Sequence, residues 1–178
     1  MQPAKLFRHC PRCGAARSPE DVGCVPLRCG GCGLLYFFNP SVAAAAFVFD
    51  DRGRALFIRR AHDPAKGKLA IPGGFVDIGE TAEGGLQREI REEVGLEVAD
   101  LAFLGSWPNL YAYREVTYPV VDLVFTARAV APESARSLDG VAGIEWLRPA
   151  DIDPAELAFP SIRETLKLLT ATASRPAP

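Results

Sequence analysis

The 178-residue sequence predicts an α/β (α+β) fold, in which helices pack on a mixed β-sheet, preceded by a small metal-binding module at the N-terminus. Three observations predict this arrangement. Four cysteines stand in two C-x2-C steps within the first 32 residues, short apolar runs of strand character follow them, and two later segments have the periodicity of amphipathic helices. Strands before, between and after two helices are typical of a sheet with helices packed on it.

The composition is that of an ordinary globular protein. Apolar residues make up 48% and charged residues 24% of the chain, and the formal net charge is −2, which excludes a wholly disordered chain and nucleic-acid binding through overall charge. The longest unbroken apolar run, Val42–Phe49, is too short to span a membrane. Because the N-terminal residues lack the apolar segment of a secretory signal, we expect a cytoplasmic protein without membrane association.

The paired cysteines predict a zinc ribbon over residues 1–38. Cys10 and Cys13 form one step, Cys29 and Cys32 the other, with 15 residues between the steps, which is the spacing of a tetrahedral Zn²⁺ site. Four thiolates close the coordination shell, so we expect a structural zinc and no bound water. Two disulfides are the alternative, which the absence of an export signal disfavours. We expect Cys24 and His9 to lie outside the site.

The ribbon has a charge opposite to that of the rest of the chain. Residues 1–36 contain five basic and two acidic residues, a local charge of +3. Such a surface can touch RNA, phosphate or a partner protein, but solvated surface charge explains it equally well. We therefore expect no nucleic-acid partner. The main domain is predicted over residues 39–172, with a frayed tail over 173–178.

The first strands after the cysteines are short and apolar. We expect strands over 34–38, 42–49 and 55–58, the last two forming a hairpin because Asp50-Asp51-Arg52-Gly53 separates them. Short strands follow over 69–71 and 75–77, on either side of Pro72-Gly73-Gly74.

The clearest helix is predicted over 82–94. Apolar residues recur every four positions along it, and Gly95 stands where a helix C-cap places glycine. Later strands are expected over 102–104, 118–126 and 143–147. A final helix is expected to start at Ser161, which forms a capping box with Glu164.

Three carboxylates on the predicted helix indicate a cation site. Glu89, Glu92 and Glu93 stand at i, i+3 and i+4 and so share an arc of roughly 100°. Their repulsion is relieved if a divalent cation lies among them, and ligands that are all oxygen favour Mg²⁺ or Mn²⁺. The alternative is an exposed acidic face balanced by Arg88 and Arg91. The glycines upstream favour the cation, because they give phosphate or metal close access to the backbone.

The segment from Gly74 to Leu96 resembles the Nudix box. It reads Gly, five residues, Glu80, seven residues, Arg88-Glu89-apolar, one residue, Glu92-Glu93, one residue, Gly95-apolar, with every specified position filled. With the cysteine ribbon ahead of it, the chain is similar over about residues 8–170 to the zinc-ribbon Nudix group. That group includes NADH pyrophosphatases and FAD or ADP-ribose pyrophosphohydrolases.

The resemblance implies a Nudix-type α/β/α sandwich and a hydrolase that cuts the pyrophosphate of a nucleoside diphosphate linked to another moiety. It implies that Glu89, Glu92, Glu93 and the carbonyl group of Gly74 hold Mg²⁺ or Mn²⁺, and that Glu92 or Glu93 orients or deprotonates the attacking water. Arg88 is expected to pair with Glu80 and to bind no metal. A small nucleotide is the implied substrate, and a homodimer is the implied assembly.

Some features stay open in the sequence. The NADH pyrophosphatase motif Ser-Gln-Pro-Trp-Pro-Phe-Pro is matched only at Ser106 and Pro108, so the resemblance does not specify NADH. Aromatic or basic side chains are candidates for substrate contacts, namely Trp107, Tyr111 and Arg59. A further acidic residue from a later loop is expected, with three candidates: Glu133, Asp139 and Glu145. A hydrolase that removes damaged nucleoside triphosphates, and a ribbon that binds nucleic acid beside a Nudix sensor, are the alternative functions.

Overall fold

The computed structural model describes residues 1–173. These residues form two compact units, one made of Met1–Ser41 with Leu110–Val120 and the other of Val42–Asn109 with the chain from Val121 onward. The predicted domain boundary between residues 38 and 39 stays a prediction. The tail predicted over 173–178 lies outside the described residues, except that Ala173 ends the last helix.

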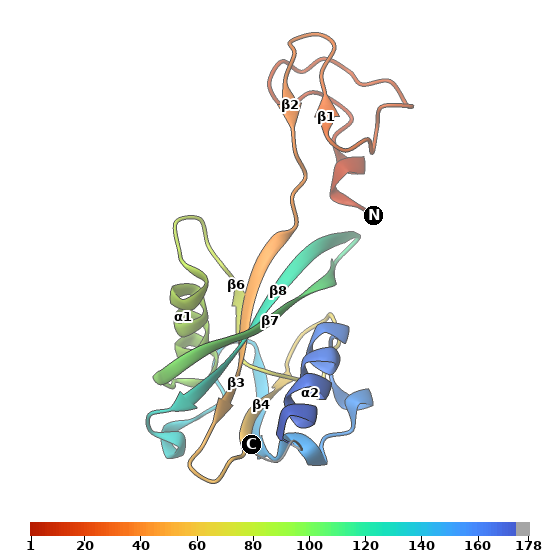
Figure 1. Ribbon diagram of the computed structural model, residues 1–178. Helices are drawn as coiled ribbons and strands as arrows, with labels where there is room; N and C mark the ends of the chain where they lie inside the picture. The colour runs from red at the N-terminus through yellow and green to blue at the C-terminus, as the bar shows by residue number, and fades with distance from the viewer. Residues whose placement is uncertain (174–178) are drawn as a thin grey trace. The chain divides into compact units, whose positions relative to one another are not determined.

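The first unit contains little regular structure (Figure 1). A short 3-10 helix, η1 (Pro3–Leu6), precedes an antiparallel pair of two-residue strands, β1 (Leu27–Arg28) and β2 (Leu35–Tyr36). The strand predicted over 34–38 is therefore shorter than expected. Leu27 is fully buried in this unit, and few other apolar side chains are, which leaves a metal as the natural source of stability.

The second unit is built on a seven-stranded sheet. Its central path runs β5-β4-β3-β8-β7, while β6 pairs with β3 and β9 pairs with β4. The strands are β3 (Ser41–Phe49), β4 (Ala55–Arg60), β5 (Leu69–Ala70), β6 (Gly73–Phe75), β7 (Val98–Tyr113), β8 (Val116–Ala129) and β9 (Val141–Leu147). The hairpin predicted between β3 and β4 is confirmed by the antiparallel pairing of Phe49 with Ala55.

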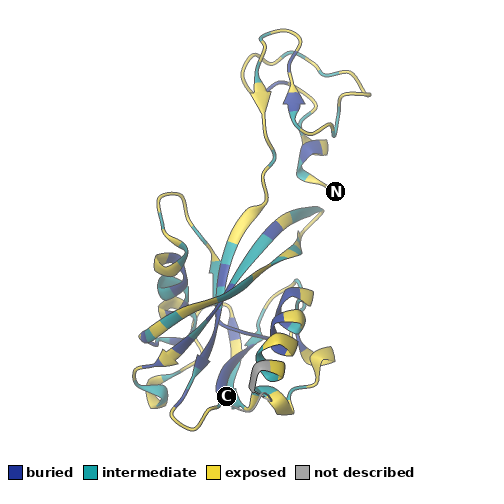
Figure 2. Cartoon of the chain, in the orientation of Figure 1, coloured by how far each residue is buried: buried dark blue, intermediate teal, exposed yellow. Residues whose placement is uncertain are grey.

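Two helices pack on this sheet from opposite sides, α1 (Ala82–Val94) and α2 (Pro160–Ala173) (Figure 1). Three short 3-10 helices lie in the connections: η2 (Pro132–Ser134), η3 (Pro149–Asp151) and η4 (Pro154–Glu156). The buried core joins the sheet to the inner faces of the helices, as the dark residues of Figure 2 show. The predicted helix over 82–94 and the predicted fold class are confirmed. Within the described chain, no helix has the length and apolar character needed to cross a bilayer.

Several predicted element boundaries are wrong. The glycines expected to break the chain at 73–74 lie inside β6, where both pair with β3, and residues 76–77 follow that strand rather than forming it. Strand β7 extends far beyond the predicted 102–104, because strand β8 pairs along it. Helix α2 begins at Pro160, so Ser161 lies in its first turn; the Ser161 hydroxyl donates to Asp122 (Oγ–Oδ2 2.5 Å) instead of forming a capping box.

Candidate active site

Helix α1 is fixed at both ends. Thr81 caps its N-terminus by accepting a hydrogen bond from the Gly84 N–H (3.1 Å), and Gly95, with a left-handed φ of 68°, donates from its N–H to the Arg91 carbonyl group (3.0 Å). The predicted glycine cap is confirmed. One face of the helix is fully buried through Leu86, Ile90 and Val94. The caps and the buried face therefore fix the orientation of the helix, and its three candidate carboxylates lie along one edge of it.

Arg88 is the centre of an ion-pair network on that edge. Its Nε and Nη2 atoms each lie 2.9 Å from an oxygen of Glu80, which is a bidentate pairing. Its Nη1 atom lies 2.9 Å from Glu89 Oε1 and 3.1 Å from Glu92 Oε2. Hydrogen bonds from Arg88 and from the Asp77 N–H lower the pKa of Glu80 to about 2. Glu80 is thus a permanent anion that holds Arg88 in place.

Glu93 points to a different part of the site. Its Oε2 atom accepts a 3.0 Å hydrogen bond from the backbone N–H of Gly73 in β6. Burial raises the pKa of Glu93 to about 8. The Gly73 hydrogen bond and the positive charge of Arg60 oppose this rise, and the negative charges of Glu89 and Asp139 add to it. A carboxyl group so placed is ionised at neutral pH only if a nearby positive charge compensates it.

Glu89 lies directly against the second glycine of β6. A β-carbon added at Gly74 would lie 2.4 Å from the Glu89 carboxyl carbon, so any other residue there would displace the carboxylate. Burial raises the pKa of Glu89, and the hydrogen bond from Arg88 only partly offsets the rise. The Gly73-Gly74 backbone and two of the three candidate carboxylates therefore form one wall.

This donor set fits a hard divalent cation. It supplies carboxylate oxygens and a backbone carbonyl group, which are the ligands that Mg²⁺ and Mn²⁺ prefer. Burial of Glu89 and Glu93 also outweighs the positive charges that act on them, those of Arg88 and Arg60 respectively. Among the described residues, however, the three carboxylates do not converge within 4.8 Å as the four cysteines do. Glu92 binds Arg88 and has a side chain that is 53% exposed, so it must turn for all three to share one ion.

One of the three candidate distal acids lies beside this edge. Residues 136–139 cover the C-terminal end of α1, where the N–H groups of Arg136, Leu138 and Asp139 donate to its last carbonyl groups. The Asp139 N–H donates to the Glu92 carbonyl oxygen (3.3 Å), and the Asp139 charge acts on Glu93. The structure therefore brings Asp139 to the predicted carboxylates.

The other two candidate acids are placed differently. Glu145 on β9 forms an ion pair with Arg59 on β4 (Oε1–Nε 2.6 Å), so each is the other's partner. Glu133 is exposed on η2, which follows strand β8. Neither has a hydrogen bond or ion pair to α1 among the described residues.

The four predicted zinc ligands form a second, separate cluster. The sulfur atoms of Cys10, Cys13, Cys29 and Cys32 all lie within 4.8 Å of one another. Two of the sulfur pairs, Cys10–Cys32 and Cys13–Cys29, are 3.7 Å apart, and all four cysteines are free thiols. Tetrahedral coordination with Zn–S bonds of about 2.3 Å requires sulfur separations of about 3.8 Å, so the cluster fits zinc.

The two cysteine steps have the same local structure. The Gly14 N–H donates to the Cys10 carbonyl group (2.9 Å), and the Gly33 N–H donates to that of Cys29 (3.0 Å), each glycine having a positive φ. These knuckle turns direct both thiols of a step to one point. Cys24 is exposed and outside the cluster, and its thiol donates to the Glu20 carbonyl group.

Comparison with known proteins decides the family. The model of the NUDIX domain matches residues 39–169. The chain belongs to the NUDIX family. The Nudix hydrolase resemblance seen in the sequence is thereby confirmed, and Nudix enzymes generally use divalent cations.

The relatives of this NUDIX chain match it over different lengths. An NAD-capped RNA hydrolase NudC from Pseudomonas aeruginosa is 29% identical over 173 residues, which cover 96% of this chain and 58% of that protein. An ADP-ribose pyrophosphatase from Methanocaldococcus jannaschii is 36% identical over 99 residues, covering 54% of this chain and 56% of that protein. The chain thus spans little more than half the length of these relatives.

Solved structures show the same fold. A NUDIX hydrolase from Nitrosomonas europaea has a TM-score of 0.69 at 22% identity and covers 96% of both chains. The NUDIX domain of Shewanella oneidensis NrtR, crystallised with ADP ribose, has a TM-score of 0.62 at 20% identity and covers 76% of this chain and 90% of that one.

The candidate substrate contacts have other neighbours in this NUDIX chain. Trp107 lies on β7, packs against the hydrophobic core and covers Gly105, where an added β-carbon would lie 2.5 Å from the indole ring. Tyr111 belongs to the Leu110–Val120 segment of the first unit. Arg59 is paired with Glu145 and also donates to the Gly67 carbonyl group (3.1 Å). Their roles in binding substrate stay predictions.

A partly buried polar cluster joins β7, β8 and α2, and it was not predicted from the sequence. The Asp122 carboxylate on β8 accepts hydrogen bonds from Asn109 on β7 (2.8 Å) and from Ser161 at the start of α2 (2.5 Å). Burial raises the pKa of Asp122, and these two hydrogen bonds oppose the rise. The three residues are far apart in the sequence and form no motif, so their spacing carries no signal.

Proposed function

We propose that the protein is a divalent-cation-dependent hydrolase that cuts the pyrophosphate of a nucleoside diphosphate linked to another moiety. One observation supports this most strongly. Glu89 and Glu93 are desolvated carboxylates set against the bare backbone of Gly73-Gly74, next to Glu92. The positive charges that act on them, Arg88 on Glu89 and Arg60 on Glu93, do not offset this burial. A site that concentrates negative charge in this way is suited to a cation, and through the cation to phosphate.

In this proposal Mg²⁺ or Mn²⁺ is held by Glu89, Glu92, Glu93 and the Gly74 carbonyl group. The bound cation neutralises pyrophosphate charge and lowers the pKa of water. Arg88 positions this set, because it is fixed by Glu80 and reaches both Glu89 and Glu92. Gly73 orients Glu93 by its N–H.

We propose Asp139 as the distal acid that accepts the proton of the attacking water. Its loop is fixed to the end of α1 by backbone hydrogen bonds, which gives the carboxylate a defined place beside Glu93. Glu145 is less suited to this role because Arg59 already pairs with it. Glu133 has no comparable tie to α1.

For the substrate, the relatives favour a dinucleotide such as NADH or FAD, or ADP-ribose, because two of them are named for NAD-capped RNA and ADP-ribose. The NAD-capped end of an RNA is a second candidate, favoured because the Pseudomonas relative aligns with the ribbon as well as the NUDIX domain. Hydrolysis of nucleoside triphosphates is the remaining alternative.

We further propose that the cysteine cluster holds structural Zn²⁺. Four thiols fill a tetrahedral shell and leave no place for substrate. Free thiols at this spacing suit a reducing compartment, which supports a cytoplasmic location. The expected homodimer stays a prediction, which light scattering of the purified protein tests.

The experiment is a substrate panel with matched variants. The purified protein is incubated with FAD, NADH, ADP-ribose, nucleoside triphosphates and an NAD-capped oligoribonucleotide, with Mg²⁺, Mn²⁺ or chelator. We expect release of a nucleoside monophosphate, or of a 5′-monophosphate RNA end, from one of the pyrophosphate-linked compounds, and none with chelator.

The Glu92→Gln and Glu93→Gln variants should lower kcat by at least about 100-fold, the effect expected when electrostatic groups of a transition state are lost. Glu83→Gln is the matched control, since Glu83 is an exposed glutamate in the first turn of the same helix. Hydrolysis that is insensitive to chelator, or equal rates in all three variants, would contradict the proposed site.

A further inference from the structure

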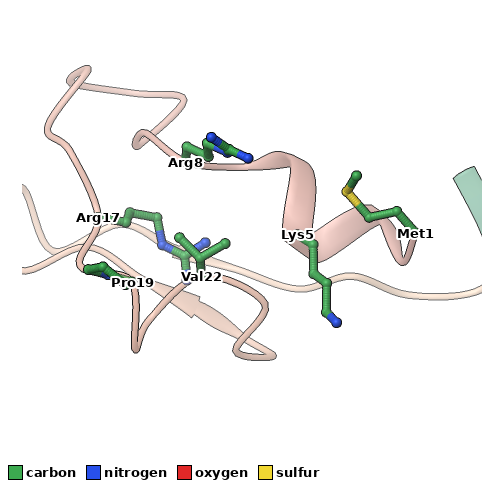
Figure 3. Close-up of a pocket in the computed structure, with 6 residues that line it drawn as sticks. All are labelled: Met1, Lys5, Arg8, Arg17, Pro19 and Val22. Atoms are coloured by element: carbon green, nitrogen blue, oxygen red, sulfur yellow. The ribbon is translucent and has the colours of Figure 1, made fainter. Parts of the chain in front are cut away.

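The first unit contains a basic hollow that the proposed active site does not use. Its cavity volume is about 490 Å³, and its lining consists of Met1, Lys5, Arg8, Arg17, Pro19 and Val22 (Figure 3). Half of these six side chains are cationic and none is acidic. All six come from the first 22 residues, within one compact unit.

Arg17 forms the fixed part of this basic hollow. Its guanidinium group donates to the carbonyl groups of Phe7 (2.9 Å) and Asp21, so neutral acceptors hold it and no carboxylate neutralises it. Its Nε atom is buried and has no hydrogen-bond partner among the described residues. A buried N–H without an acceptor is uncommon in native structures, so the Arg17 side chain is short of an acceptor as well as of a counter-charge.

Lys5 and Arg8 supply further charge without a counter-charge. Both are exposed, and within residues 1–173 neither side chain has a hydrogen bond or an ion pair. The nearest acidic side chains in sequence are those of Glu20 and Asp21, and neither lines the hollow. Asp21 accepts a hydrogen bond from Ser18 (2.8 Å). Three cations thus surround one concavity with their charge uncompensated, which favours a polyanion.

A group of aromatic rings is linked to Arg17 through Phe7. Phe7, whose carbonyl group binds Arg17, stacks on Tyr36 (centroids 5.9 Å apart) and meets Phe38 edge-on (5.0 Å). Tyr36 is 44% exposed, and the neighbouring Phe37 is 59% exposed. Exposed rings beside a basic groove are the combination with which proteins bind single-stranded nucleic acid, the cations taking phosphates and the rings stacking on bases.

We propose that this basic hollow binds the phosphodiester backbone of single-stranded nucleic acid, with Tyr36 and Phe37 offering stacking surfaces to the bases. Inorganic phosphate and lipid headgroups share the phosphate chemistry, but they have no bases that could stack on the exposed rings. The inference goes beyond the proposed hydrolysis and does not depend on it. It also departs from the expectation drawn from the sequence, because a charge count does not reveal which cations lack partners.

The test measures fluorescence anisotropy of the full, zinc-loaded chain with a labelled single-stranded RNA of about 12 nucleotides, within the range of known site sizes. The RNA ends in a 5′-hydroxyl group, so it presents no pyrophosphate to the NUDIX site. The Lys5→Gln/Arg8→Gln variant should raise the Kd by at least about tenfold. It should also reduce the salt slope by about 0.7 for each phosphate that is no longer neutralised.

Arg12→Gln/Arg28→Gln is the matched control. Both residues are exposed in the same unit, neither lines the basic hollow, and the change in charge is equal. We expect the Kd of this variant to change by less than about twofold, because long-range attraction between net charges contributes little at physiological salt. Zinc content, measured for every variant, must stay at that of the parent chain for the comparison to count.

An equal rise in the Kd for RNA in both double variants would overturn the proposal, because it would mean that RNA is attracted by the net charge of the unit and not bound at the basic hollow. So would displacement of the RNA by inorganic phosphate at the same phosphate concentration, or binding to vesicles of anionic lipid without binding to RNA. Hydrolysis of the full substrate panel, assayed in parallel, reports on the proposed function separately. Absence of hydrolysis of every compound in the panel, together with selective RNA binding, would refute the hydrolase proposal and leave the binding site standing.

Discussion

The backbone N–H of Gly73 donates a 3.0 Å hydrogen bond to the Glu93 carboxylate, which joins strand β6 to helix α1. Gly73 has a φ of 144°, a conformation that L-residues other than glycine rarely adopt. A β-carbon there would lie 2.2 Å from the Ala44 carbonyl oxygen in the neighbouring strand. The position of the donor therefore depends on the absence of a side chain.

Gly73→Ala should destabilise the fold by about 3 kcal/mol, since overpacking costs about 1–3 kcal/mol and a left-handed backbone adds about 1–2 kcal/mol. Gly53→Ala is the control, because Gly53 also has a positive φ (72°) but nothing lies within 4 Å of its added β-carbon. Urea unfolding of both variants measures the difference. Equal losses of stability in the two variants would show that β3 shifts to accommodate the added methyl group, so that the close approach of Ala44 does not add to the cost.

The Glu80–Arg88 pair makes a pH-dependent contribution to stability. Because the hydrogen bonds from Arg88 and Asp77 hold the pKa of Glu80 at about 2, below its ordinary 4.5, folding favours the ionised form. The contribution is fully present above pH 4.5 and is lost as the pH falls toward 2.

Glu80→Gln should therefore lower Tm most at neutral pH, and the gap from the parent chain should close as the pH falls from 4.5 to 2. Thermal unfolding followed by circular dichroism across this range measures the gap. Glu83→Gln, an exposed change in the first turn of α1, should leave Tm nearly constant relative to the parent at every pH. A gap for Glu80→Gln that does not vary with pH would argue against the pairing.

The features that the sequence predicted correctly are those encoded locally. Helix α1 follows from an apolar residue every fourth position and a glycine stop, and both of its ends are as predicted. The cysteine cluster follows from spacing within two short turns. In each case the determining residues lie within one turn or one helix, so their pattern alone predicts the element.

The features that it missed depend on interactions between distant segments. Strand β7 is more than twice as long as a typical strand because β8 pairs along it. No pattern within the β7 sequence itself predicts this pairing. Ser161 has the pattern of a helix cap, but its tertiary hydrogen bond to Asp122 gives the hydroxyl another partner. The choice among the distal acids likewise depends on the loop at 136–139 lying on α1.

Removal of zinc should unfold the ribbon while the second unit stays folded. Few apolar side chains are buried around the cysteines, and binding of structural zinc contributes about 10–16 kcal/mol in comparable modules. Cys10→Ser, or a strong chelator, should make residues 1–41 sensitive to protease, with release of one zinc per chain. Cys24→Ser should change neither zinc content nor protease sensitivity, because Cys24 is exposed and outside the cluster.

Asp139→Asn tests which carboxylate acts with the helix. The change keeps the size of the side chain and the backbone hydrogen bond to Glu92, and it removes the charge beside Glu93. If Asp139 accepts the proton of water, kcat should fall by about 100-fold or more at unchanged KM, the range for loss of a general base. Steady-state hydrolysis of the best substrate from the panel measures both constants.

The other two candidate acids serve as controls. The kcat of Glu133→Gln should stay within about threefold of that of the parent chain, since Glu133 is exposed and has no tie to α1. Glu145→Gln breaks the ion pair with Arg59 and should change KM if Arg59 binds phosphate. A loss of kcat in Glu145→Gln but not in Asp139→Asn would instead assign the role of general base to Glu145 on β9.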